Sequence, residues 1–165
     1  MKQMEVTQKV IGENTFYLKP FPAFVAANIS GELTALISPM LGALGGVVGE
    51  DADNFDIRNV KVDDAVPAVS KAFNGITGDK VEDLMKKLLV QHKNIAVSGP
   101  ATGDATKQLD MDLANEVFCG ELQDMYALCF EVIKLNYAGF FRKFGDLFGG
   151  QKSASPTMDM TASAT

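Results

Sequence analysis

Few side chains in this sequence have the type and spacing that chemistry requires. One close pair of carboxylates, Asp110 and Asp112, flanks Met111. Carboxylates at this spacing can bind Mg²⁺ or perform acid–base catalysis, but no third ligand lies near them in the sequence. Helix capping and contact with solvent explain the pair more simply.

The single histidine and the two cysteines do not form a catalytic or metal-binding pattern. His92 follows a predicted helix and precedes a predicted strand, which suggests a charge at the helix C-terminus or a surface residue. Cys119 and Cys129 stand among apolar residues, as small core side chains do. Three such residues are too few for a zinc cluster. We therefore expect no enzyme activity, with no catalytic, cofactor-binding or metal-ligating residues.

The glycine-rich segments do not match a phosphate-binding loop. Residues 98–104 lack the Gly-Lys-Ser/Thr ending that holds phosphate and Mg²⁺, and the segment from Gly42 to Gly49 contains no lysine. The sequence therefore gives no reason to expect a bound nucleotide.

The net charge excludes two classes of partner. The chain carries 21 acidic and 15 basic residues, a net charge of −6. Proteins that follow nucleic-acid phosphates or anionic lipid usually carry a basic surface, so we expect neither partner. Hydrophobic residues make up 47% and charged residues 22%, as in soluble globular proteins. This composition predicts a single domain over residues 1–150, followed by a disordered Ser/Thr/Ala-rich tail over residues 151–165.

One uncharged stretch, from Leu33 to Gly49, approaches the length of a membrane span. Pro39 interrupts it, several glycines crowd its end, and no basic cluster flanks it. We interpret it as a buried helix, with a membrane-active protein as the weakest alternative. Residues 1–8 also lack the apolar run of a secretory signal.

Two segments near the N-terminus predict a β-hairpin. Polar and apolar residues alternate from Met4 to Val10, Gly12-Glu13-Asn14 has turn composition, and residues 15–19 form the returning strand. Because two strands alone are marginally stable, the hairpin must pair further. The apolar segment Asn94–Val97 supplies the third strand.

Apolar residues at helical spacing predict four to six helices, and hence an α+β fold with a small antiparallel sheet. We expect a break near Asn28–Gly31, with Ser30 capping the second piece, and a short edge strand at Val60–Val62. Segment 108–112 is either a fourth strand or the approach to a helix capped by Asp112. The predicted helices lie at residues 21–48, 64–74, 79–91, 113–119 and 121–144.

Large apolar residues gather at the end of the last predicted helix. They are Phe140, Phe141, Phe144, Leu147 and Phe148. The four phenylalanines span an arc of about 100° on a helical wheel, with Leu147 outside it. These five side chains either close the core or contact a partner, and we take them as candidate partner-binding residues.

Two segments resemble the tail assembly chaperones of long-tailed bacteriophages. The first is Lys9-Val-Ile-Gly-Glu-Asn-Thr-Phe-Tyr-Leu-Lys-Pro-Phe-Pro-Ala-Phe24. The second is Asn115–Phe141, which contains Phe130-Glu-Val-Ile-Lys-Leu-Asn-Tyr137 followed by Phe140-Phe141. The resemblance extends over most of residues 4–148, and it concerns structural residues and not catalytic ones.

The resemblance implies a non-enzymatic assembly factor in the host bacterial cytoplasm that is absent from the mature virion. Such chaperones bind the tape measure protein, keep it soluble, and help recruit tail-tube protein through a longer frameshifted form. A homo-oligomer is also compatible with this family. The alternative is a small structural or tail-completion protein of the virion.

Overall fold

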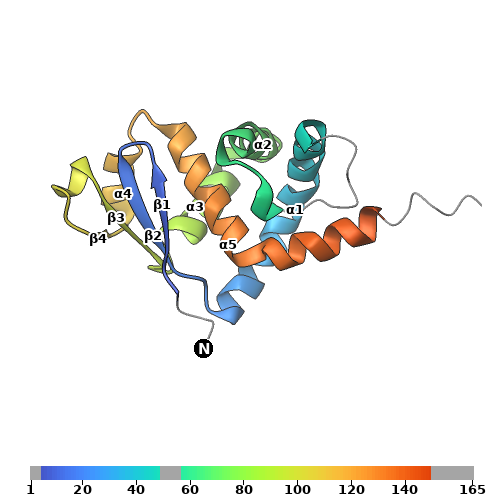
Figure 1. The fold of residues 1–165 in the computed structure, drawn as a ribbon, viewed down its shortest axis with the longest axis horizontal. Coiled ribbons are helices and arrows are strands. Elements are labelled where there is room, and N and C mark those ends of the chain that lie inside the picture. The colour runs from blue at the N-terminus through green and yellow to red at the C-terminus, as the bar shows by residue number, and fades with distance from the viewer. Residues whose placement is uncertain (1–4, 49–56, 150–165) are drawn as a thin grey trace, which may run out of the picture.

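The computed structural model describes residues 5–48 and 57–149, with side chains described except at 36–48, 141 and 143–149. It has four strands and five α-helices, which confirms the predicted α+β class (Figure 1). The strands are β1 (Thr7–Ile11), β2 (Asn14–Leu18), β3 (Ile95–Ser98) and β4 (Lys107–Gln108). The helices are α1 (Ala23–Val48), α2 (Val62–Asn74), α3 (Gly78–Leu89), α4 (Met111–Val117) and α5 (Leu122–Gly149), and short 3-10 helices occur at Ile57–Asn59 and Pro100–Thr102.

The four strands form one antiparallel sheet in the order β1-β2-β3-β4. Phe16 lies opposite Lys9 on β1 and opposite Val97 on β3, so the hairpin pairs with the predicted third strand. The hairpin turns at Gly12, whose φ of 58° favours glycine. A side chain at Gly12 would also collide with the carboxylate of Asp124 on α5.

One face of the sheet packs on the helices. Phe16, Leu18, Ile95 and Val97 are buried there, and the Phe16 ring stacks on Phe118 with ring centroids 5.8 Å apart. In β1 the alternating apolar residues point away from the helices, since Val10 is 72% exposed. Ile11 is the buried apolar residue of this strand. The alternation correctly predicts a strand, but its apolar set lies on the outer face.

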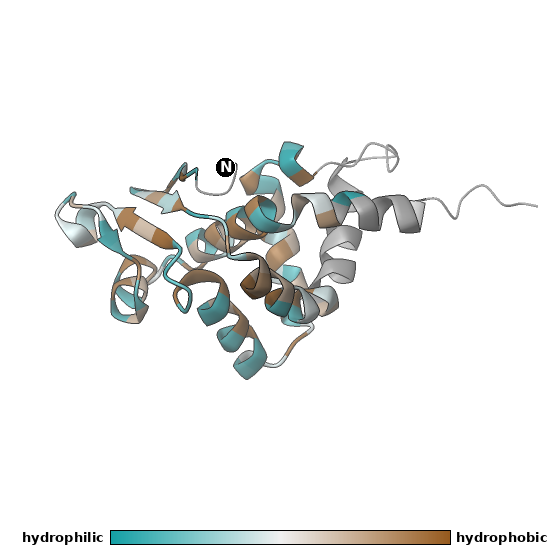
Figure 2. Ribbon diagram, turned by 90° about the horizontal axis from the view of Figure 1, so that it is seen from below, coloured by the Kyte–Doolittle hydropathy of each residue, from teal (hydrophilic) through white to brown (hydrophobic). Residues whose placement is uncertain are grey.

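Helix α5 is the centre of the fold. It contacts β1, α2 and α3, and in Figure 1 it runs between the sheet on one side and α1 and α2 on the other. Residues 127–133 are all buried, as expected for a helix with neighbours on every side. In Figure 2 the outward turns of the described helices are largely hydrophilic, and the hydrophobic segments lie mostly between elements.

The predicted break in the first helical block is wrong. Helix α1 is continuous through Asn28–Gly31 and through Pro39. Ser30 does not cap a second piece, because its hydroxyl donates a hydrogen bond to the Ala27 carbonyl 2.7 Å away inside the helix. Burial of Ile29 and Leu33 on the neighbouring elements maintains the helix through residues of lower helix propensity.

The segment before α2 also differs from the prediction. Val60–Val62 is not a strand, because Val62 already begins α2. The residue before the helix is Lys61, which makes no side-chain capping hydrogen bond, and Asp63 and Asp64 lie within the first turn. Pro67 lies in the second turn of α2, beyond the first turn where proline fits best. Ile57, in the short 3-10 helix before α2, is buried and attaches this segment to the core.

The region 107–120 contains both of the elements that the sequence offers as alternatives, a fourth strand and a helix. A two-residue strand β4 pairs with β3, and α4 follows it. The cap of α4 is Asp110 and not Asp112, since the Asp110 Oδ1 accepts a hydrogen bond from the Leu113 N–H at 2.9 Å. The predicted helix at 121–144 also extends further, to Gly149.

Among the described residues, no helix has the length and apolarity that a membrane crossing requires. Residues 1–4, 49–56 and 150–165 lie outside the described ranges, and the last of these ranges includes the predicted tail.

Candidate partner-binding groove

An apolar groove of about 700 Å³ opens where α2, α3, α4 and α5 meet. Its apolar lining combines three methionines with aromatic and aliphatic side chains. The residues that dominate it are Phe73, Ile76, Val81, Met85, Leu89, Met111, Phe118, Leu122, Met125 and Tyr126.

The groove presents large apolar side chains to solvent. Leu122 is 51% exposed and Met111 is 41% exposed, whereas Met85 and Phe118 beneath them are buried. The Phe73 and Tyr126 rings contact each other, with ring centroids 5.5 Å apart. Exposed apolar side chains clustered over a buried floor mark an interaction surface more often than a solvated one. The unbranched methionines can also adapt to the shape of a bound segment.

The local sequence explains how the groove is built. Asp110 caps α4, and this fixes the start of the helix and the position of Met111. Gly120, with φ of 77°, then lies in the turn between α4 and α5, where its backbone conformation favours glycine. Cys119 and Leu122, on either side of this turn, line the groove together with Met111, so the two helices share one apolar surface.

An ion pair occupies the α3 edge of the groove. Lys86 binds Glu82 one turn earlier in the helix. The hydrogen bond and the attraction from Lys86 lower the pKa of Glu82, and the same contacts raise the pKa of Lys86. Both side chains are therefore charged near neutral pH, and the charge of Lys86 is compensated within its own helix.

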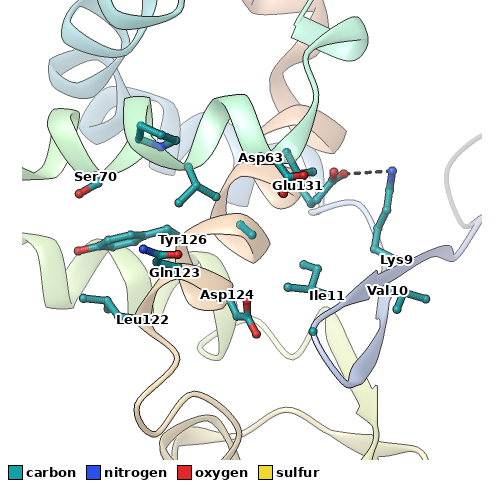
Figure 3. A pocket seen from close by; sticks show the side chains of 15 residues that line it. Lys9, Val10, Ile11, Asp63, Ser70, Leu122, Gln123, Asp124, Tyr126 and Glu131 are labelled. Atoms are coloured by element: carbon teal, nitrogen blue, oxygen red, sulfur yellow. Dashed lines mark ion pairs between the residues drawn. The ribbon is translucent and has the colours of Figure 1, made fainter.

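A second hollow of about 900 Å³ lies between β1, α2 and α5 (Figure 3). Its lining is more polar and includes Asp63, Ser70, Gln123, Asp124 and Glu131. Leu122 and Tyr126 line both this hollow and the groove, so the start of α5 separates the two.

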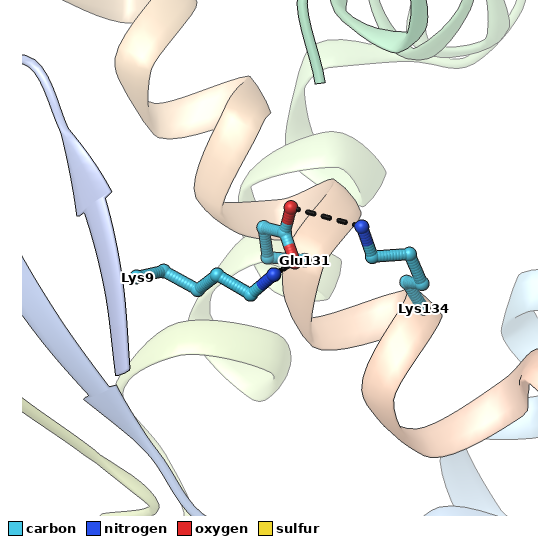
Figure 4. A network of polar contacts seen from close by, with 3 residues as sticks. All are labelled: Lys9, Glu131 and Lys134. Atoms are coloured by element: carbon cyan, nitrogen blue, oxygen red, sulfur yellow. Dashed lines mark hydrogen bonds and ion pairs between the residues drawn. The ribbon is translucent and has the colours of Figure 1, made fainter. Parts of the chain in front are cut away.

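The buried carboxylate of this second hollow is fully engaged in ion pairs. Glu131 is only 2% exposed, and its two oxygens lie 3.2 Å from Lys9 Nζ and 3.1 Å from Lys134 Nζ (Figure 4). The paired lysines offset the cost of burying the charge and attach β1 to α5. We therefore assign Glu131 a structural role.

The five residues predicted to bind a partner all lie on the last part of α5. Phe140 is 39% exposed. The side chains of Phe141, Phe144, Leu147 and Phe148 lie outside the described ones. Figure 1 shows this end of α5 pointing away from the sheet, and Phe140, whose side chain is described, is not among the residues that line the groove.

The remaining candidate residues do not come together in one site. Asp110 is a helix cap, and the described residues contain no group of three potential metal ligands. Cys129 is buried as predicted, but Cys119 is exposed at the groove and is not a core residue. His92 is half-buried, with its ring edge-on to Phe21 at 5.7 Å between ring centroids.

Sequence reasoning missed the groove because its residues come from segments far apart in the chain, from Phe73 to Tyr126. The available sequence signal was the set Met85, Met111 and Met125, whose spacing reveals nothing until the helices are packed together.

Comparison with known proteins supports the resemblance seen in the sequence. No curated protein and no solved structure matches the chain. The family model described as "Phage tail assembly chaperone protein, TAC" matches residues 12–149, which include the groove and the segment Phe130–Tyr137. The chain therefore belongs to the phage tail assembly chaperone family.

Proposed function

We propose that this chaperone binds the tape measure protein through the groove and keeps it soluble during tail assembly. The observation that carries the proposal is the exposed pair Met111 and Leu122 over the buried floor of the groove. A tape measure protein exposes long apolar helical surface, and an amphipathic helix laid in an apolar groove is a common way to cover such a surface. The family to which the chain belongs supports this choice of partner.

We further propose that the chaperone acts in the host bacterial cytoplasm and leaves the tail before the virion is complete. A longer frameshifted form would recruit tail-tube protein. The end of α5, with Phe140, Phe141, Phe144, Leu147 and Phe148, is proposed as a second contact surface, supported by the partial exposure of Phe140.

Co-expression with the tape measure protein of the same phage tests the proposal. The double variant Met111→Ser/Leu122→Ser should weaken binding about tenfold or more, since each apolar side chain contributes roughly 1.5–3 kcal/mol when buried, and should therefore lower the soluble fraction of the tape measure protein. Both side chains are substantially exposed, so the variant should fold. The matched control is Val10→Ser, an exposed apolar residue of β1 outside the groove.

Three outcomes would contradict parts of the proposal. If the wild type does not raise tape measure solubility, the chaperone function is wrong. If Phe140→Ser removes solubility and the groove variant does not, binding occurs at the end of α5. If purified virions retain the protein, it is a structural tail subunit.

A further inference from the structure

The groove continues into a smaller hollow at the start of α4. This hollow, of about 490 Å³, shares Lys86, Val90 and Met111 with the groove and adds Asp110 and Asp112. The apolar surface therefore leads into a carboxylate-lined end, and a bound segment that follows the groove would meet both environments.

The charged side chains that line the two connected hollows are Glu82, Lys86, Asp110 and Asp112. Their sum is −2, from three carboxylates and one ammonium group. Lys86 is paired with Glu82, which leaves the two aspartates to set the charge at the end of the groove. The positive end of the α4 dipole reduces this charge by about half a unit at most, so the end of the groove stays negative.

We propose that the groove binds an amphipathic helix whose apolar stripe is followed by lysine or arginine, and that Asp110 and Asp112 pair with that basic group. This proposal rests on the proposed function and specifies the kind of tape measure segment that is bound. Charge complementarity at an interface sets register and partner choice more than total affinity. A second copy of this chain fits less well, because its net charge of −6 would repel the same carboxylates.

Two synthetic helical peptides with one identical leucine stripe test the proposal. One peptide carries two lysines at each end, and the other carries two glutamates at each end. Fluorescence polarisation with the full chain at low salt should show at least about fivefold tighter binding of the lysine peptide, as expected for two partly exposed ion pairs. The preference should shrink at 300 mM NaCl, because salt screens exposed charges.

The matched variant is Asp110→Asn/Asp112→Asn, since asparagine at position 110 still caps α4. It should bind both peptides within about twofold of each other. The control Glu5→Gln/Glu13→Gln removes two exposed carboxylates outside the groove and should keep the preference.

The results separate this inference from the proposed function. Equal binding of the two peptides, or a preference for glutamate, overturns the charge inference, even where Met111→Ser/Leu122→Ser still abolishes tape measure solubility. Dimer formation of the wild type that this groove variant abolishes would assign the groove to a second copy and would also overturn it.

Discussion

The side-chain carbonyl of Asn136 accepts a hydrogen bond from the backbone N–H of Phe21 at 2.7 Å, across 115 positions of sequence. The amide group of the same side chain donates to the Val132 carbonyl at 2.8 Å, and this fixes its orientation. Asn136 thereby attaches the link between the hairpin and α1 to the central helix α5.

Two other residues of the segment Phe130–Tyr137 have the same kind of role. Glu131 pairs with Lys9 on β1, and the Tyr137 hydroxyl donates to the Ala26 carbonyl on α1 at 2.8 Å. Three polar side chains of one helix thus contact three successive parts of the N-terminal region. The most specific part of the family resemblance is therefore a set of structural attachments that hold the N-terminal region on α5.

Replacing Asn136 with alanine should destabilise the protein. The variant leaves the N–H of Phe21, a buried residue, without its partner, at a cost of about 1–3 kcal/mol. Urea unfolding followed by circular dichroism measures the change. The control Gln123→Ala lies on the exposed start of the same helix and should leave the midpoint nearly unchanged. Equal midpoints for Asn136→Ala and wild type would contradict the attachment.

The Glu131 ion pairs predict that Glu131→Gln destabilises the protein more than Lys9→Met does. Glu131→Gln removes the shared carboxylate from both lysines, of which Lys134 is mostly buried, and should cost about 2 kcal/mol or more. Lys9→Met should cost less, because Glu131 keeps Lys134 as a partner. Glu82→Gln, in an exposed helical pair, should have no measurable effect. A larger loss for Lys9→Met than for Glu131→Gln would show that β1 attachment depends on Lys9 alone.

Stability should fall in alkaline solution. Burial raises the pKa of Cys129 from 9.0 to about 12 and the pKa of Tyr137 from 10.0 to about 12. Between these values the unfolded chain has lost protons that the folded protein still holds. The free energy of unfolding is therefore unaffected by these groups below about pH 9 and decreases as the pH rises toward 12.

Substitution of Cys129 or Tyr137 should change the slope with which the free energy of unfolding decreases with pH. Cys129→Ala should flatten the dependence from about pH 9 upward, and Tyr137→Phe should flatten it from about pH 10. Urea unfolding at a series of pH values gives the slopes. At neutral pH, Tyr137→Phe should also cost about 1 kcal/mol through the lost hydrogen bond to Ala26. Slopes equal to that of the wild type would show that neither group titrates differently in the folded protein.

The sequence predicted the elements that local patterns determine. The hairpin, the strand near Ile95 and the amphipathic helix α3 all occur close to the expected residues. Local composition predicts a helix break at Asn28–Gly31, but tertiary burial keeps α1 continuous there. In β1 the alternation places Val10 in the apolar set, but Ile11 is the residue that faces the helices. The alternation shows that a segment is a strand, but the face that is buried depends on which side the helices pack.

The candidate site was less predictable than the fold. The phenylalanines near the end of α5 are predicted as a binding surface because they are close together in the sequence. The groove joins residues of four helices, and Cys119 is exposed in the turn between two of them, which a list of apolar residues does not reveal.

The two cysteines predict a direct test of the groove. Cys129 is buried and its pKa is raised, so it should not react with a thiol reagent at pH 8, whereas Cys119 is exposed and should react. Titration with Ellman's reagent should detect one accessible thiol per folded chain and two after unfolding. The control Cys119→Ala should leave none in the folded protein. Because Cys119 lines the groove, the lysine peptide should slow its reaction about in proportion to the bound fraction. An unchanged rate at saturating peptide would show that the bound helix lies elsewhere on the chaperone.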